Sequence, residues 1–231
     1  VYFTDSNTGL AVGIDGTMLK TTNGGGEWIS QNCGTKEYLW SIFFTDSNNG
    51  WAVGNTMLRT TNGGNHWISQ SYGTKNQLQS INFTDSNHGW AVGYQGTILK
   101  TSNSGKKWMS QNSGTLNKLN SVFFSDSNHG WAVGDYGTML KTTDGGDIWI
   151  TQNCGTKDWL KSVYFIDSIT GWVVGESKIL KTTDGGINWT NQNIEMDYWD
   201  WWDLESVYFI DSNTGWAVGV SKILKTTDGG N

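Results

Sequence analysis

The sequence predicts an all-β protein built as a β-propeller, with six blades of four short antiparallel strands each. A turn motif recurs six times, apolar and polar residues alternate in short runs, and no segment has the periodicity of an amphipathic helix. The spacing of the repeats also fits, because propeller blades recur at roughly 40–45 residues. The units are 41, 39, 41, 41 and 44 residues apart, measured between Val1, Ile42, Ile81, Val122, Val163 and Val207.

The fourth unit shows how the sequence specifies each strand. The apolar run at residues 119–124 predicts the first strand, and a Ser/Asp/Asn/Gly turn at 125–130 leads to the second strand at 131–134. A short loop precedes the third strand, expected over residues 138–143. A second turn then leads to the fourth strand over residues 149–152, after which a connector enters the next blade.

The recurring turn motif has Thr, then Asn or Asp two residues later, then Gly, and finally Trp. In residues 142–149 it reads TTDGGDIW, and the sixth copy ends at Asn231 before its Trp. The Asn or Asp side chain can accept hydrogen bonds from backbone amides, and Gly adopts the positive φ that a tight reversal needs. The residues assigned to this structural role are Asn23, Asn62, Asn103, Asp144, Asp184 and Asp228, with Trp28, Trp67, Trp108, Trp149 and Trp189.

This motif resembles the Asp-box, the hairpin of bacterial neuraminidases and many other β-propellers. The longer pattern SVFFSDSNHGWAVG at residues 121–134 resembles the BNR-type propellers of photosystem II assembly factors, whose relatives are widespread in secreted bacterial proteins. The resemblance covers essentially the whole chain and implies a secreted or cell-surface propeller. Those assembly factors hold a partner polypeptide with the help of basic surface residues, whereas this chain is acidic. The resemblance therefore implies only the general role of a non-catalytic scaffold.

We expect a single propeller domain over residues 1–231, and a seven-bladed propeller is the alternative. The chain begins and ends inside repeats, so we expect it to be a piece of a longer chain. The sixth unit lacks its fourth strand, so its third strand is expected to offer an open edge for pairing with another strand. The predicted repeats are 1–41, 42–80, 81–121, 122–162, 163–206 and 207–231.

Composition restricts the partners. The formal charge of −6 and the single arginine, Arg59, argue against a nucleic-acid surface. The chain contains no run of 18 apolar residues, so no membrane span is predicted.

Cys33 and Cys154 occupy equivalent repeat positions, which would lie on opposite sides of a six-bladed ring, so we expect no disulfide between them. The repeated first-turn aspartates lack the later Glu of a calcium loop, so neither a metal nor a cofactor is expected.

Five of the 15 tryptophans fall outside the repeat pattern: Trp40, Trp159, Trp199, Trp201 and Trp202. They are expected in connectors between blades, at the end of each blade where the sequence varies most. The insertion at residues 194–203, IEMDYWDWWD, is the densest cluster; the alternative is that it packs as a structural lid. Exposed aromatic rings beside carboxylates suit stacking on sugars or anchoring a peptide. The predicted ligand-binding residues are Trp199, Trp201, Trp202, Trp159, Tyr136, Asp197 and Asp200.

The residues also bear on whether the chain is an enzyme. Sialidases clamp the substrate carboxylate with three arginines, and this chain has one, which excludes that activity. A glycosidase acting through two carboxylates has many candidates, but the sequence marks no pair. The sequence therefore favours a non-catalytic module that presents an aromatic and acidic face to a protein, peptide or glycan. A lectin or a non-sialidase glycosidase is the alternative.

Overall fold

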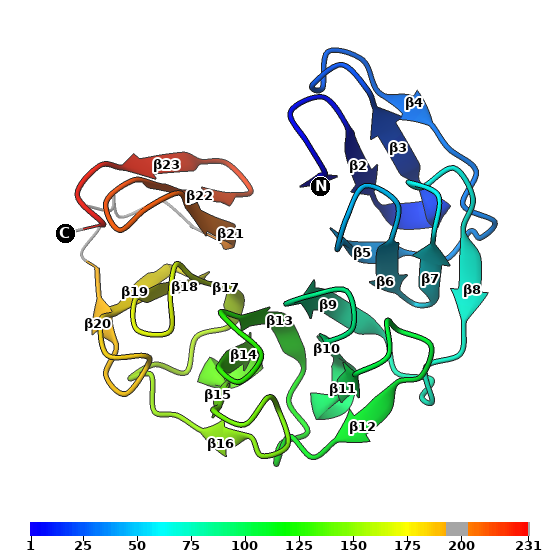
Figure 1. The fold of residues 1–231 in the computed structure, drawn as a ribbon. Coiled ribbons are helices and arrows are strands. Elements are labelled where there is room, and N and C mark those ends of the chain that lie inside the picture. Colours follow the sequence, from blue (N-terminus) through cyan, green and yellow to red (C-terminus); the bar gives the residue numbers. More distant parts are fainter. Residues whose placement is uncertain (193–202, 231) are drawn as a thin grey trace. The chain divides into compact units, whose positions relative to one another are not determined.

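The computed structural model describes residues 1–192 and 203–230, and within these ranges it contains β-strands and three short 3₁₀ turns. The strands form six antiparallel sheets, which Figure 1 shows as successive groups along the chain. Five sheets have four strands, and the sixth has three described strands. The predicted all-β fold of six propeller blades, with an incomplete sixth blade, is confirmed.

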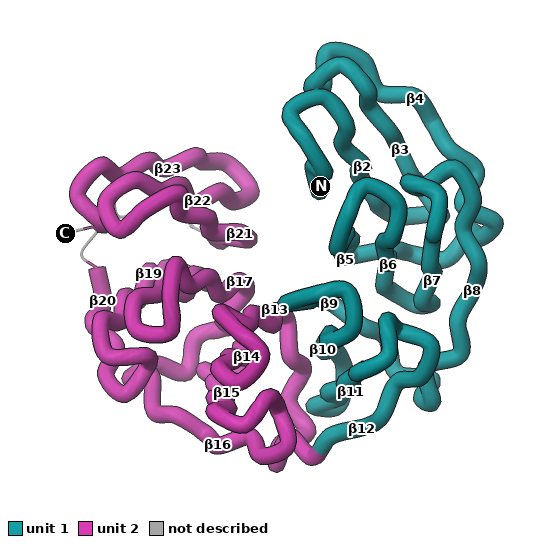
Figure 2. The backbone as a smooth tube through the Cα atoms, viewed as in Figure 1, with its two compact units in different colours: residues 1–111 teal, residues 112–231 magenta. Residues whose placement is uncertain are grey.

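The chain divides into two compact units of three blades each, residues 1–111 and 112–231 (Figure 2). Unit 1 contains β1 (Tyr2–Phe3), β2 (Gly9–Val12), β3 (Met18–Thr21), β4 (Ile29–Ser30), β5 (Leu39–Phe44), β6 (Gly50–Gly54), β7 (Met57–Thr60), β8 (Ile68–Gln70), β9 (Leu78–Phe83), β10 (Gly89–Gly93), β11 (Ile98–Thr101) and β12 (Met109–Gln111), with the turns η1 (Ile14–Gly16) and η2 (Tyr94–Gly96). Unit 2 contains β13 (Leu119–Phe124), β14 (Gly130–Gly134), β15 (Met139–Thr142), β16 (Ile150–Thr151), β17 (Leu160–Phe165), β18 (Gly171–Gly175), β19 (Lys178–Thr182), β20 (Thr190–Asn191), β21 (Leu204–Phe209), β22 (Gly215–Gly219) and β23 (Ile223–Thr226), with the turn η3 (Asp135–Gly137).

Strand order within each sheet follows the sequence, as expected for a blade. In the fourth blade Trp131 pairs with Phe123 on one side and Lys141 on the other, and Lys141 pairs with Ile150. The first strand has the predicted bounds, whereas β16 covers only two residues and Trp149 lies just before it. Because these strands are antiparallel and in sequence order, the turns after β13 and β15 lie at one end of the blade. The loops after β14 and β16 lie at the other end.

Within each unit, aromatic rings from neighbouring blades stack on one another. In unit 2, Trp131 of β14 stacks on Phe165 of β17 with 3.6 Å between ring centroids. Phe165 also meets Trp189, the Asp-box Trp of its own blade, edge-on at 5.9 Å and 88°. Trp131 is fully buried, and such paired arrangements add to the burial of aromatic area. Trp131 and Trp189 thus both pack against Phe165 in the core of this blade pair.

The basic residues of the third strands lie over these same tryptophans. The Lys141 ammonium lies 5.9 Å from the ring centroid of Trp131. In unit 1 the Arg59 guanidinium carbon lies 5.5 Å from the centroid of Trp51. A cation over an indole face is attracted by the negative face of the ring. These cations therefore help to hold the third strand of a blade to the second.

The Asp-box turn has the predicted hydrogen bonds. In the fourth blade the Thr142 hydroxyl donates to Asp144 Oδ1 at 2.8 Å, and the Ile148 amide donates to the same oxygen at 3.0 Å. The Gly146 amide donates to Thr142 Oγ1 at 2.9 Å. In the first blade, Asn23 Oδ1 accepts the corresponding amide of Glu27 at 2.9 Å. The prediction that these side chains bond to backbone amides is confirmed.

Asn and Asp are divided between the two units at this position. The three Asp-boxes of unit 1 use Asn, and those of unit 2 use Asp. The Asn188 backbone and side-chain N–H groups lower the pKa of Asp184 to about 2. The Ile148 backbone amide, followed by the Thr142 hydroxyl, lowers the pKa of Asp144. A carboxylate that accepts several N–H bonds is stabilised in its charged form, so unit 2 has an acid sensitivity at its Asp-boxes that the Asn side chains of unit 1 lack.

Replacing both Asp144 and Asp184 with Asn should make thermal stability less dependent on pH in acid. Because the folded-state pKa of these groups lies below the ordinary value of 3.8, their contribution is present above that value. It is lost as pH falls through the folded pKa, between about pH 4 and about pH 2. Melting curves by circular dichroism across this range test the prediction. Asn62→Asp, made in unit 1, should steepen the dependence, and equal profiles for all three proteins would contradict it.

Candidate binding surface on the connector loops

The structure describes two of the seven predicted ligand-binding residues, Tyr136 and Trp159. The other five, Asp197, Trp199, Asp200, Trp201 and Trp202, lie outside the described residues. The site is therefore built here from the loops whose positions are described. Within unit 2 these are the turn η3 and the connector that enters β17.

Tyr136 and Trp159 form an exposed aromatic pair. Tyr136 is the middle residue of η3, and Trp159 immediately precedes β17. Their ring centroids are 6.2 Å apart and the rings are nearly perpendicular, at 77°. The two residues remain 64% and 38% exposed. The structure thus brings together two residues that the sequence only assigned to the same end of the blade.

The backbone fixes where Tyr136 points. Tyr136 has a left-handed conformation, with φ 58° and ψ 37°, which costs a non-glycine residue about 1–2 kcal/mol. The Gly137 amide donates to the Asp158 carbonyl at 2.9 Å, and the Asp135 amide donates to the Lys118 carbonyl at 3.0 Å. A Cβ on Gly137 would lie 2.0 Å from the Thr156 carbonyl oxygen, so this position requires glycine. Tyr136 therefore lies at the tip of a loop whose two neighbouring residues, Asp135 and Gly137, are both held by backbone hydrogen bonds.

The pair is surrounded by groups of both charges. Lys161 Nζ lies 5.2 Å from the ring centroid of Trp159, and Glu176 Oε2 accepts the Trp159 amide at 3.4 Å. Asn120 Nδ2 donates to Asp135 Oδ1 at 2.9 Å. Together with the aromatic pair these residues define what we call the unit 2 connector patch. Its members are Lys118, Asn120, Asp135, Tyr136, Trp159, Lys161 and Glu176.

Burial lowers the pKa of Lys118 in the unit 2 connector patch, and the nearby Asp135 carboxylate opposes that effect. The patch as a whole has an aromatic surface flanked by charged groups. Its lysines can bind carboxylates of a ligand, and its carboxylates can accept hydrogen bonds from N–H groups of a ligand. That combination suits a polypeptide or another ligand with both apolar and polar groups.

Unit 1 has a second aromatic pair, in which Tyr38 precedes β5 as Trp159 precedes β17, whereas Trp40 lies at the repeat position of Lys161. The Tyr38 and Trp40 ring centroids are 5.7 Å apart at 87°, and the residues are 40% and 45% exposed. The assignment of Trp40 to a connector was wrong, because it is the second residue of strand β5. Tyr38 and Trp40 are two residues apart, which places them on one face of an extended segment. Sequence reasoning missed this pair although that spacing was visible. Tyr72, which follows β8, is buried, and its hydroxyl donates to the Asn55 carbonyl at 3.4 Å.

The remaining candidate groups have local structural partners. His88 Nδ1 lies 2.8 Å from Asp85 Oδ2 within a turn. Over residues 1–192 and 203–230, no group of three His, Cys, Asp or Glu side chains is placed to hold a metal ion. In the same ranges no helix is long and apolar enough to cross a membrane.

Both cysteines are free thiols, as predicted, and the structure shows in addition that both are buried. Cys33 Sγ lies 3.1 Å from the Gly16 carbonyl oxygen, and Cys154 Sγ lies 3.3 Å from that of Gly137. Each thiol therefore packs beneath a loop that follows a second strand. In the fourth blade this is the loop that presents Tyr136.

Fold and turn motifs together define an Asp-box repeat β-propeller with aromatic pairs exposed on its connector side. A family model, PSII_BNR, described as photosynthesis system II assembly factor YCF48, matches residues 26–110, 69–151 and 148–231. The chain belongs to this family, which confirms the resemblance drawn from its motifs. A comparison with curated proteins found no match.

Solved structures show the same fold. YCF48 bound to D1 peptide is 19% identical, with 98% of this chain and 91% of that chain covered and a TM-score of 0.54. YCF48 from Cyanidioschyzon merolae is 17% identical, with 100% and 95% covered and a TM-score of 0.53. An ancestral GH74 enzyme is 16% identical with a TM-score of 0.79, but the match covers 97% of this chain and only 35% of the enzyme. At these identities the likeness concerns the fold alone.

Proposed function

We propose that this protein is a non-catalytic scaffold that binds an extended peptide segment of a partner protein at the unit 2 connector patch. The observation that carries the proposal is the exposed Tyr136–Trp159 pair, held by a fixed backbone. The family supports a peptide as the class of ligand, since one of its structures is of YCF48 bound to D1 peptide.

The chemistry of the patch fits a peptide. Tyr and Trp provide large rigid contact areas at low entropic cost, and such residues dominate the binding energy of many interfaces. Lys161 can pair with a carboxylate of the ligand, and Asp135 and Glu176 can accept its N–H groups. A fixed loop also reduces the entropy lost on binding, because Tyr136 needs no reordering.

A glycan is the second candidate ligand. The observation that favours it is the partly exposed indole of Trp159 beside the carboxylate of Glu176. An exposed ring face suits stacking on a sugar, and a carboxylate suits its hydroxyl groups. The likeness to GH74 enzymes adds no support for hydrolysis, because it concerns the fold alone.

Tyr136→Gly is the sharpest test of this function. The substitution removes the ring and relieves the left-handed strain, so the melting temperature should stay the same or rise. Peptides selected from a displayed random library against the whole chain provide the probe, and their Kd is then measured by titration calorimetry. We expect Tyr136→Gly or Trp159→Ala to weaken binding by about tenfold or more.

Gln95→Gly is the matched control, because Gln95 occupies the same left-handed turn position in the third blade with φ 55°. It should leave the Kd unchanged. Selected peptides that bind all of these variants equally would refute the proposed patch. Failure to select any peptide, together with binding on a glycan array that Trp159→Ala abolishes, would favour the glycan.

A further inference from the structure

Unit 1 contains a small pocket of about 60 Å³ on its second blade. The pocket is formed by the third and fourth strands of that blade, β7 and β8, and by the Asp-box turn between them. Its volume exceeds the roughly 10–15 Å³ that one water molecule needs, so a small polyatomic group can enter. We call it the Arg59 pocket, and its lining residues are Arg59, Thr61, Asn62, His66, Ile68 and Gln70.

Arg59 differs from its repeat equivalents in both identity and contacts. The other repeats have lysine at this position: Lys20, Lys100, Lys141, Lys181 and Lys225. The Lys20 ammonium reaches the next blade, where it donates to the Gly63 carbonyl at 2.8 Å and to Asn65 Oδ1 at 3.0 Å. Arg59 lies over Trp51 and lines a pocket of its own blade. Among the residues that the structure describes, nothing accepts a hydrogen bond from its buried Nε, and no carboxylate forms an ion pair with it. The guanidinium is therefore a cation without a counter-charge.

The Asp-box turn and the fourth strand add hydrogen-bond donors to this cation. Asn62 Oδ1 already accepts the Thr60 hydroxyl at 3.0 Å and the His66 amide at 2.9 Å, so the Nδ2 group is the end of Asn62 that can bind a ligand. Either neutral tautomer of His66 has a ring N–H, and Gln70 has a side-chain NH₂ group. The pocket thus has donors from both strands and from the turn.

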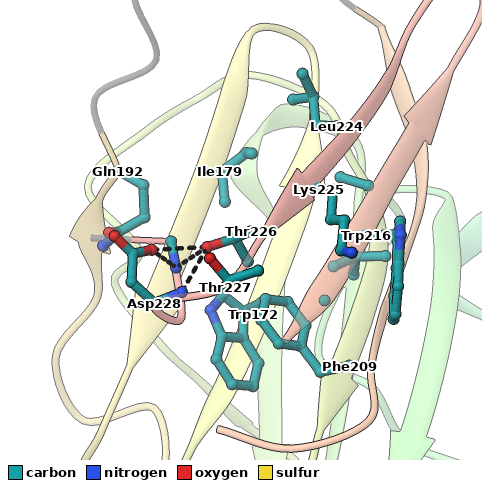
Figure 3. Close-up of a pocket in the computed structure, with 14 residues that line it drawn as sticks. Trp172, Ile179, Gln192, Phe209, Trp216, Leu224, Lys225, Thr226, Thr227 and Asp228 are labelled. Atoms are coloured by element: carbon teal, nitrogen blue, oxygen red, sulfur yellow. Dashed lines mark hydrogen bonds between the residues drawn. The ribbon is translucent and has the colours of Figure 1, made fainter. Parts of the chain in front are cut away.

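A larger pocket in the sixth blade provides a contrast in charge. Figure 3 shows Lys225 and Asp228 among the residues that line this open pocket of about 430 Å³. Lys225 has the repeat position of Arg59, and Asp228 has that of Asn62. In the second blade the neutral Asn62 replaces the carboxylate, and the lining includes no acidic residue. The Arg59 pocket therefore combines a positive charge with neutral donors.

The surroundings of the Arg59 pocket are basic although the chain as a whole is acidic. Asp85 is the single acidic residue between positions 47 and 111. The basic residues in the same range are Arg59, Lys75, Lys100, Lys106 and Lys107. A Cβ on Gly105 would meet the Trp51 indole, so the turn that carries Lys106 and Lys107 lies beside the ring that Arg59 covers. A local excess of positive charge attracts anions to such a surface.

We propose that the Arg59 pocket binds a tetrahedral oxyanion, a sulfate or phosphate group that is either free or carried as a monoester. A planar guanidinium matches such a group with two parallel N–H bonds, and Asn62 and His66 donate to the remaining oxygens. Donors on two strands and a turn suit a group whose oxygens face several directions, whereas the guanidinium alone would satisfy a planar carboxylate. The pocket belongs to unit 1 and shares no residue with the unit 2 connector patch.

The test uses the isotope-labelled whole chain, because its single arginine gives one side-chain Nε–H signal in NMR spectra. Inorganic sulfate or phosphate, added at low and constant ionic strength, should shift this signal and the His66 amide signal saturably. Sodium chloride and acetate should not. O-phosphoserine is the second probe: binding at least as tight as that of phosphate indicates a monoester on a larger ligand, and weaker binding indicates the free ion. Shifts that do not saturate, or acetate that binds as tightly as phosphate, would overturn the proposal.

Arg59→Lys is the main variant, since it keeps the positive charge and introduces the residue of the other repeats. It removes the planar donor pair and should weaken oxyanion binding, followed at the His66 amide, by about tenfold or more. Lys75→Ala is the control for net charge, because Lys75 is exposed and lies outside the pocket. It should leave the Kd nearly unchanged. An equal loss in both variants would show that net charge alone attracts the anion, which would refute the pocket.

Asn62→Asp gives a second test if Arg59→Lys does not fold. Asp is the residue of the unit 2 Asp-boxes, so the turn should be retained, while the new negative charge should weaken oxyanion binding by about tenfold or more. Circular dichroism checks the fold of each variant. Unchanged affinity in Asn62→Asp would contradict the assigned position of the anion. Tyr136→Gly should bind the oxyanion as the parent does, which separates this site from the proposed peptide-binding function.

Discussion

Replacing Trp149 with alanine is expected to lower the free energy of unfolding by ~3–5 kcal/mol. The side chain is only 8% exposed and meets Phe124 edge-on, with 5.7 Å between centroids at 89°. An indole that buries ~150–200 Å² contributes up to ~4–5 kcal/mol at ~25 cal/mol per Å². The loss also opens the Asp-box hairpin, because the ring covers its turn. Urea unfolding followed by circular dichroism measures the effect without depending on tryptophan fluorescence.

Trp40→Ala is the matched control for Trp149→Ala. Trp40 is 45% exposed and contacts Tyr38 at the surface, so its removal should cost less than ~1 kcal/mol. A loss below ~1 kcal/mol for Trp149→Ala as well would show that the Asp-box tryptophan does not carry the stability assigned to it.

Gly134→Ala is expected to destabilise the fourth blade by ~1–3 kcal/mol or more, through overpacking. Gly134 is extended, with φ −167°, so its backbone conformation would tolerate alanine. The added Cβ, however, would lie 2.0 Å from the Lys118 carbonyl oxygen, where the pairing of β13 with β14 shifts register. That carbonyl also accepts the Asp135 amide, so moving it would disturb the loop that holds Tyr136.

Gly13→Ala provides the control at the same repeat position in the first blade. Gly13 is also extended, with φ −164°, but its nearest neighbour to a Cβ would be Thr17 Cβ at 3.6 Å, an ordinary contact. Its effect should stay within ~1 kcal/mol in either direction. Paired urea titrations of the two variants decide the matter. Similar small effects would mean that β13 and β14 can separate at this point at little cost.

The strands and turns were predictable because their determinants are local. In each Asp-box the hydrogen-bonded residues are two to four positions apart, as between Thr142 and Asp144 or between Asp144 and Ile148. A hairpin held by such bonds is visible in a short stretch of sequence. The length of the fourth strand was less predictable, because β16 ends where pairing with β15 ends.

The candidate site was predictable as a region but not as a geometry. The contact of Tyr136 with Trp159 depends on the left-handed backbone at Tyr136 and on the hydrogen bond from the Gly137 amide to the Asp158 carbonyl. Neither feature can be predicted from a local sequence pattern. The stack of Trp131 on Phe165 likewise joins two blades. Trp40 was misplaced although Asn120, its equivalent in the fourth blade, falls within the first strand predicted there. The site role of the insertion, centred on Trp199, Trp201 and Trp202, stays a prediction.

The residues with left-handed backbone at the loop tips also suggest how ligand preference can vary on a constant scaffold. Asp15, Gln95, Tyr136 and Ser177 all have φ between 52° and 58°, yet their side chains differ in charge, size and aromaticity. Main-chain bonds such as that from the Gly16 amide to the Glu37 carbonyl hold these loops in place. Side-chain identity can therefore be exchanged at constant backbone geometry. We expect a combinatorial library confined to these four positions to diversify ligand preference while expression and melting behaviour stay close to those of the parent.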